Sequence, residues 1–509
     1  MNPRTHLEKA INLNPDFSEA YFELGLLEKL EGNQADALKL FKKAVSINKN
    51  FAEAECELAI TLMNTGELEE SKDHFLNSLE INPNYADAYY NYGLLLTKLH
   101  DIEEAKNNFD KVTEINQNYA KAYYQKARLL VHADDYESAR KNYETAIDID
   151  NEFVDAHYYM AKLLSGGVAT DKEGTIIDRT DITEAKKHLH KILKLKPNHI
   201  KSLYNLAKID YEKEDFNRAK TNLNKAIKLH PKYWKAQFLL GKLYLKIEDT
   251  QSAEKNFLLS IQNHEINPKS YYELGNIYFK QSDFKRAEEF FNKSISQEDE
   301  NAKAHYYVAK IHSKNGDSAQ AKKHFYKSLE IDPEYANTYY ELGHHCLKFD
   351  EINEAKIHFQ KTTDIDQNFA KAYYYLAKSL NNPSEYDQAF RNYETALEID
   401  PQMEECHYHF ASLLINGSKL QNDGTLVKEP DLHLAEKHLC KAIKVNPNFF
   451  KAHYKIGKLK NIQKKYEEAL ACFKKCIKIE NDYAKAHYEI ALLLIKKKIQ
   501  SLPLTNNSE

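Results

Sequence analysis

The feature that most constrains the fold of this chain is a phrase that returns every 34 residues. It is a small or polar residue, an aromatic pair, an apolar residue and then Gly or Ala, as in EAYFELG, DAYYNYG and KAHYYVA. A period of this length indicates an array of small units that bury a core only when they stack. The closing Gly or Ala falls at residues 25, 59, 93, 127, 161, 207, 241, 275, 309, 343, 377, 411, 457 and 491.

A second phrase follows each of the first thirteen at the matching offset. It is in most cases an Ala, then an aromatic residue or Leu four residues later and a small residue three after that, as in Ala37, Phe41 and Ala44. Steps of four and three place the three side chains on one face of a helix. With only 12 Pro and 14 Gly in 509 residues, we expect each unit to be two amphipathic helices joined by a short turn.

This pattern resembles the tetratricopeptide repeat (TPR) family, whose 34-residue unit carries small residues at its positions 8, 20 and 27. In the first repeat these positions hold Gly25, Ala37 and Ala44, and about 14 such repeats cover nearly the whole chain. The resemblance implies an all-α TPR solenoid, a right-handed superhelix of antiparallel helix pairs that is continuous over residues 1–509. It also implies that the first helix of each repeat, here called the A helix, lines a concave groove, with the B helix outside. Residues 500–509 are expected to form a disordered tail.

Two steps between repeats are 46 residues instead of 34, and each contains an insert between an A helix and its B helix. The inserts are SGGVATDKEGTIIDRT at residues 165–180, in the fifth repeat, and INGSKLQNDGTLVKEP at residues 415–430, in the twelfth. Turn residues between short apolar segments favour a small β-hairpin in each. The sequences around the two inserts align, so duplication of a seven-repeat block explains why they recur. They are either docking ridges or tolerated insertions in a surface turn.

The A helices carry a second stripe, at positions 2, 5 and 9, nearly opposite the stripe that packs on neighbouring helices. In six repeats this stripe reads basic, aromatic, basic. We name these residues the A-helix stripe. They are Lys121, Tyr124 and Arg128; Lys201, Tyr204 and Lys208; Lys235, Phe238 and Lys242; Lys303, Tyr306 and Lys310; Lys371, Tyr374 and Lys378; and Lys451, Tyr454 and Lys458.

The stripe is basic although the whole chain is nearly neutral, with 71 basic and 76 acidic residues. The first three repeats and the two with inserts differ, having for example Asp155 and Glu405 at position 2. The pattern favours an extended acidic protein segment as the ligand, because Lys and Arg pair with carboxylates and Tyr offers ring faces and a hydroxyl donor. The alternative is that the rings support packing and that the lysines are solvated surface charge.

No catalytic, cofactor or metal signature accompanies the repeats. The sequence has no P-loop, no GxSxG elbow and no HExxH motif, so the protein is predicted not to be an enzyme and no cofactor or metal ligand is assigned. The six cysteines form no CxxC pair and are expected to be reduced thiols. Histidines recur at position 4, where a packed ring is expected. They are His157, His305, His407, His453 and His487.

The N-terminal sequence, the apolar segments and the net charge indicate where the protein is located and which classes of partner it has. The N-terminal sequence MNPRTHLEKAINLNP has no signal-peptide layout, and no segment approaches the roughly 20 apolar residues that a membrane helix needs. A cytoplasmic protein without membrane insertion is therefore expected. The near-neutral charge gives no indication of nucleic-acid binding.

These observations predict a non-catalytic scaffold that binds protein or peptide partners in the groove. The carboxylate clamp of chaperone-binding TPR domains is missing, because position 5 is aromatic in every repeat except one, where it is Cys56. Two alternatives stay open. One is the substrate-recognition arm of a larger enzyme, such as a TPR-containing glycosyltransferase, and the other is RNA binding through the basic groove.

Overall fold

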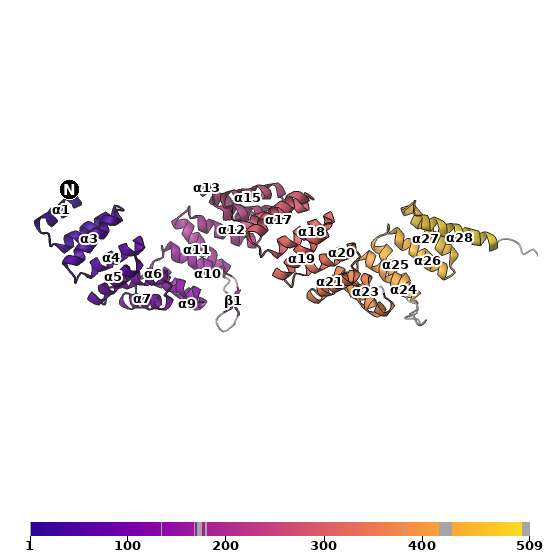
Figure 1. Cartoon of the computed structure of the whole chain (residues 1–509), viewed down its shortest axis with the longest axis horizontal. Coiled ribbons are helices and arrows are strands. Elements are labelled where there is room, and N and C mark those ends of the chain that lie inside the picture. The colour runs from indigo at the N-terminus through magenta and orange to yellow at the C-terminus, as the bar shows by residue number, and fades with distance from the viewer. Residues whose placement is uncertain are drawn as a thin grey trace, which may run out of the picture. The chain divides into compact units, whose positions relative to one another are not determined.

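The fold is described from a computed structural model of the chain, shown in Figure 1. The structure describes residues 2–133, 135–166, 168–170, 176–178, 181–380, 382–416 and 430–500. Its contacts divide the chain into two compact units, Met1–Asn263 and His264–Glu509. Each unit is an array of antiparallel helix pairs, and the predicted continuity of one superhelix over residues 1–509 stays a prediction.

The N-terminal unit begins with one helix and continues with seven A–B pairs, in which the even-numbered helices are A helices. Its helices are α1 (Pro3–Leu13), α2 (Ser18–Leu30), α3 (Gln34–Ile47), α4 (Ala52–Thr65), α5 (Leu68–Ile81), α6 (Ala86–Lys98), α7 (Ile102–Ile115), α8 (Ala120–His132), α9 (Tyr136–Ile149), α10 (Val154–Leu164), α11 (Ile182–Leu195), α12 (Ile200–Glu212), α13 (Phe216–Leu229), α14 (Trp234–Lys246) and α15 (Thr250–Asn263).

The C-terminal unit has six further A–B pairs, followed by one more A helix. Its elements are α16 (Pro268–Lys280), α17 (Phe284–Gln297), α18 (Ala302–Asn315), α19 (Ser318–Ile331), α20 (Ala336–Lys348), α21 (Ile352–Ile365), α22 (Ala370–Ser379), the 3-10 turn η1 (Pro383–Glu385), α23 (Tyr386–Ile399), α24 (Glu404–Ile415), α25 (Leu432–Val445), α26 (Phe450–Ile462), α27 (Tyr466–Ile479) and α28 (Ala484–Gln500).

The small residues of the repeat allow the two helices of each pair to approach closely. Gly343 of α20 faces the ring of Phe359 in α21, and a Cβ added at Gly343 would lie only 2.8 Å from Cε1 of that ring. Where position 8 is Ala instead, a smaller side chain can face it, as Leu223 does in the repeat of Ala207. All four residues are buried. The order of helices in both units confirms the predicted all-α array of helix pairs.

The buried hydroxyls of Ser71 and Ser78, at positions 20 and 27, are satisfied within their helix pair. The hydroxyl of Ser71 donates to the carbonyl of Ala59 at 2.7 Å, and the hydroxyl of Ser78 donates to the carbonyl of Ala52 at 2.7 Å. A small hydroxyl therefore replaces Ala at positions 20 and 27 without leaving a buried polar group unpaired.

The first insert contains two short strands, β1 (Val168–Thr170) and β2 (Ile176–Asp178). They pair antiparallel, with Val168 opposite Asp178 and Thr170 opposite Ile176. The second insert was also predicted to form a hairpin, but its residues 417–429 lie outside the described residues, as do residues 501–509 of the predicted tail.

Both inserts leave the turn of their repeat closed. In the third repeat, the amide of Asp101 donates to the carbonyl of Leu96 at 2.9 Å. The same bond joins Asp181 to Leu164 at 3.0 Å, and Asp431 to Leu414 at 3.2 Å, across the two inserts. The helix pairs are thus kept in register, which is the physical reason that the inserts are tolerated.

The thiols and the apolar character of the helices can be read from the structure. All six cysteines are free, with Cys440 exposed and Cys56, Cys346, Cys406 and Cys476 buried. Among the helices that the structure describes, none has the length and apolar character required to span a membrane.

Candidate protein-binding surface

Besides Lys269 and Lys485, which belong to repeats outside the A-helix stripe, position 2 of the A helices places six exposed lysines on the surface. Each is the second residue of its helix, and none of the six has an ion-pair partner among the described residues. The Nζ atoms of Lys201, Lys235 and Lys451 lie 5.6–6.0 Å from the centroids of neighbouring aromatic rings, but no carboxylate of the described residues neutralises any of the six charges. We name them the leading lysines. They are Lys121, Lys201 and Lys235 in the N-terminal unit, and Lys303, Lys371 and Lys451 in the C-terminal unit.

The position 5 rings lie deeper than the sequence suggested. Tyr124, Tyr306 and Tyr374 are only 8%, 7% and 2% exposed. Each packs on other rings; for example, the ring centroids of Tyr124 and Phe153 are 5.1 Å apart. The expectation that these three rings present faces to a ligand is wrong. A ring from the end of the same repeat covers Tyr124 and Tyr306, whereas Tyr374 packs against the rings of Tyr375, Tyr393 and His409. The remaining three, Tyr204, Phe238 and Tyr454, are half-buried.

Position 9 is less basic than the sequence suggested. Lys310 Nζ lies 2.6 Å from Glu341 Oε1, and Lys458 Nζ lies 2.8 Å from Glu489 Oε1. Each carboxylate comes from position 6 of the next A helix and neutralises the lysine of the preceding one. The Arg128 guanidinium stacks 5.6 Å from the ring centroid of Tyr159. The unpaired charge of the A-helix stripe therefore resides mainly at position 2.

A basic pocket of about 580 Å³ adjoins the stripe in the C-terminal unit. It lies where three successive A helices, α16, α18 and α20, approach their C-terminal ends. Three of its lysines, Lys280, Lys314 and Lys348, lie outside the A-helix stripe; their recurrence at position 13 of three successive repeats is the signal in the sequence that could have identified them. Its lining residues are Phe279, Lys280, Ser282, Phe284, Lys310, Ser313, Lys314, Glu341, His344, His345 and Lys348.

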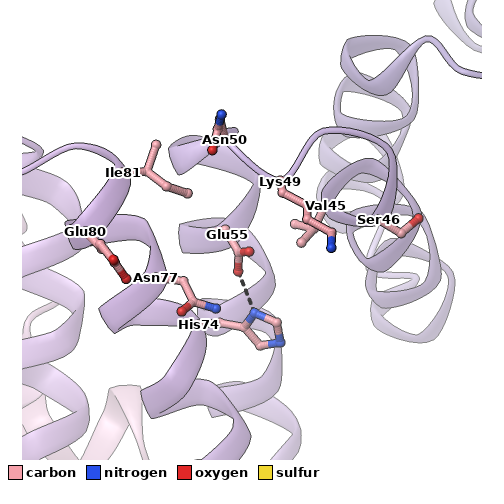
Figure 2. A pocket seen from close by; sticks show the side chains of 9 residues that line it. All are labelled: Val45, Ser46, Lys49, Asn50, Glu55, His74, Asn77, Glu80 and Ile81. Atoms are coloured by element: carbon pink, nitrogen blue, oxygen red, sulfur yellow. Dashed lines mark hydrogen bonds and ion pairs between the residues drawn. The ribbon is translucent and has the colours of Figure 1, made fainter.

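A second pocket, of about 590 Å³, lies in the N-terminal unit between α3, α4 and α5. Figure 2 shows His74 pointing to Glu55, whose carboxylate bonds to Nδ1 of the imidazole. Lys49 and Glu80 also line it. Because its charges are of both signs, this pocket has no evident preference for an acidic ligand.

Four of the five histidines at position 4 are packed as predicted. His157, His305, His407 and His453 are buried, whereas His487 in α28 is exposed. Burial lowers the pKa of His157, His305 and His407. These imidazoles are therefore neutral structural groups at neutral pH.

One group in the described part of the chain has the donor set of a metal site. Ligand atoms of Cys346, Glu354 and His358 lie within 4.8 Å of one another. However, Lys322 Nζ already lies 3.2 Å from Glu354 Oε2, and burial raises the pKa of the Cys346 thiol to about 12. A protonated thiol and a carboxylate paired with an ammonium do not favour a cation, so we assign no metal here.

Comparison with known proteins places the chain among repeat proteins. Family profiles described as tetratricopeptide repeat match residues 18–51, 52–85, 74–107, 120–153, 204–271, 268–301, 302–335 and 450–483. A search of curated proteins finds no match.

Solved structures resemble the chain at low sequence identity. A structure of the APC/C hetero-tetramer Cut9-Hcn1 is 15% identical and covers 94% of this chain and 96% of its own, with a TM-score of 0.39. Yeast Tom70 is 16% identical, with coverage of 96% and 98% and a TM-score of 0.34. YrrB, described as a TPR protein with an unusual peptide-binding site, is 24% identical, with coverage of 38% and 95% and a TM-score of 0.31.

The profile matches together cover more than half of the chain, and several begin and end with the repeats that the structure shows. This chain belongs to the tetratricopeptide repeat family.

Proposed function

We propose that the protein is a non-catalytic scaffold that binds extended, acidic segments of protein partners along its A helices. The observation that carries this proposal is the set of six leading lysines, which are exposed and unpaired at the same position of six repeats. In the C-terminal unit these ammonium groups recur in every second repeat, and such a row suits the carboxylates of an extended chain.

Helix stability does not explain these lysines. Each lies in the first turn of its helix, for example Lys235 in α14 and Lys303 in α18. The positive end of the helix dipole is there, so a cation costs roughly 0.3–1 kcal/mol instead of contributing stability. A role in binding explains why lysine occurs at this position in six repeats despite its unfavourable interaction with the helix dipole.

Because each exposed ion pair between a lysine and a ligand carboxylate is weak, the ligand must be long enough to contact several leading lysines. One exposed ion pair contributes about 0.2–1 kcal/mol, so several leading lysines must act together. Packed helices lie roughly 10 Å apart, and an extended chain spans that distance in about three residues. The leading lysines of the C-terminal unit stand in every second repeat, so we expect acidic residues about six positions apart in a segment that follows the A helices of that unit.

The first test is a quantitative pull-down from native lysate with one charge-reversal variant for each unit. Lys121→Glu, Lys201→Glu and Lys235→Glu are combined in the first variant, and Lys303→Glu, Lys371→Glu and Lys451→Glu in the second. Loss of the specific partners, by tenfold or more, is expected for the unit that holds them.

The matched controls carry the same change of charge on B helices. They are Lys141→Glu, Lys225→Glu and Lys255→Glu for the N-terminal unit, and Lys361→Glu, Lys441→Glu and Lys474→Glu for the C-terminal unit, all at exposed positions. Partners retained by every A-helix variant, or lost equally from the controls, would contradict binding along the A helices. Partners that are RNA-dependent would favour the RNA-binding alternative instead.

A further inference from the structure

The basic pocket of the C-terminal unit contains a second row of lysines, separate from the leading lysines. Lys280, Lys314 and Lys348 occupy position 13 of three successive repeats, in the last turns of α16, α18 and α20. All three are exposed and line the same pocket of about 580 Å³. Stacking of the repeats therefore brings three cations to one cavity.

The positive charge of this row is not neutralised by the protein. Glu341 is the one acidic residue that lines the pocket, and it already pairs with Lys310 at 2.6 Å. Lys348 Nζ donates to the carbonyl of Ser313 at 2.6 Å, and Lys314 Nζ lies 4.0 Å from the ring centroid of Phe284. Among the described residues, no carboxylate pairs with Lys280, Lys314 or Lys348.

The rest of the lining is uncharged. His345 forms hydrogen bonds with the hydroxyls of Ser313 and Ser318, both at 2.8 Å, and burial lowers its pKa. His344 packs edge-on against Tyr375, with ring centroids 4.1 Å apart. Together with the phenylalanine rings, these groups give the pocket a partly apolar wall beside its three cations.

We propose that this pocket binds a phosphomonoester group carried by the protein segment that lies along the A helices of the C-terminal unit. This inference rests on the proposed function. A phosphate monoester carries nearly two negative charges and three acceptor oxygens, so it matches three ammonium groups better than a single carboxylate does. Lysine binds phosphate as a point charge, and the pocket has room for both the phosphoryl group and the side chain that carries it.

The pocket and the leading lysines can be tested separately. Lys303 and Lys314 lie in the same helix, 11 residues apart, which is about 16 Å along the axis. Variants of one row therefore leave the other row intact. Lys280→Gln, Lys314→Gln and Lys348→Gln are combined to remove the pocket charges while keeping polar side chains of similar length.

The experiment measures fluorescence anisotropy of labelled 15-residue Asp/Glu-rich peptides with the full chain. One peptide carries a central phosphoserine and its counterpart carries Ser. We expect the phosphopeptide to bind at least tenfold more tightly, and the triple variant to reduce this gain to less than twofold. The control Lys361→Gln, Lys441→Gln and Lys474→Gln should keep the gain.

Each outcome has one meaning. Binding of both peptides with equal affinity overturns the phosphate site and leaves the proposed function standing. A phosphate gain that persists in the triple variant also overturns it. A phosphopeptide that binds through the pocket while the Ser peptide shows no binding supports the site and contradicts the proposed function. Competition by inorganic phosphate at the same concentration as the phosphopeptide would assign the pocket to a free anion and overturn the proposal of a protein-borne group.

Discussion

At the scale of single residues, the contact between positions 8 and 24 sets how closely the two helices of a repeat approach. Gly343 faces Phe359, whereas Ala207 stands in a repeat whose position 24 is Leu223. The pairing is one of volume, since a larger ring accompanies the residue without a side chain. The pairing is not universal, since four repeats combine Ala with an aromatic ring, as at Ala309 and Phe325.

Gly343→Ala is expected to destabilise the tenth repeat. The new Cβ would lie 2.8 Å from Phe359 Cε1 in the present arrangement, and overpacking of this kind costs roughly 1–3 kcal/mol. Adding Phe359→Leu should recover part of the loss, because Ala with Leu is the pairing of other repeats. Urea unfolding and hydrogen exchange in α20 and α21 measure both effects. No loss in the single variant, or a larger loss in the double variant, would contradict the close-packing account.

The sequence predicted this layer well, because small residues occur at positions 8 and 20 in all of the first thirteen repeats and at position 27 in eleven of them. It did not predict the burial of Tyr124, Tyr306 and Tyr374. A helical wheel treats each A helix alone, whereas a ring that covers position 5 can come from the end of the repeat, as Phe153 does for Tyr124. Such a contact becomes visible only when the repeat is folded.

At the scale of helices, three repeats join their A and B helices through a pair of histidines, of which the A-helix ring is buried in each case. His157 and His188 approach through their Nδ1 atoms at 2.7 Å, and His407 and His438 do so at 2.9 Å. The Nε2–H of His407 donates to the carbonyl of Pro401, so its Nδ1 accepts the proton of His438 Nδ1. His407 must therefore be neutral in this arrangement. His438 can gain a proton only at Nε2, the nitrogen that does not face His407.

These pairs predict a loss of stability in mild acid. Burial, reinforced by His407 and Lys441, lowers the pKa of His438 to about 4, and burial with His305 lowers that of His324 to about 4. The unfolded chain therefore takes up protons first, so the stability present above pH 6.5 is lost as the pH falls from about 6.5 towards 4. Urea midpoints measured across this range report the loss.

A non-titrating pair supplies the control for this pH dependence. The eleventh repeat has Tyr373 and Asn392 at the equivalent positions, so His407→Tyr with His438→Asn follows an existing pairing. Hydrogen exchange in α24 and α25 should then vary less with pH than in the wild type. An unchanged pH dependence in these two helices would contradict the assignment to the histidine pair.

At the scale of the whole molecule, the repeat period determines which distant residues become neighbours. The sequence reveals the leading lysines, because they recur within basic–aromatic–basic triplets. The sequence does not reveal the pocket of Lys280, Lys314 and Lys348, since residues 34 apart share a cavity only when their repeats stack. The charge of the stripe is also lower than its sequence suggests, because Glu341 and Glu489 reach back to Lys310 and Lys458 from the following repeats.

The central claim is that acidic segments bind along the A helices, and zero-length carbodiimide cross-linking tests it most directly. The reagent joins a lysine to a carboxylate that contacts it, and mass spectrometry then identifies the lysine. With an Asp/Glu-rich 20-residue peptide, we predict that cross-links concentrate at the leading lysines and at Lys280, Lys314 and Lys348. Cross-links that are as frequent at exposed B-helix lysines, such as Lys225 and Lys361, would contradict the account.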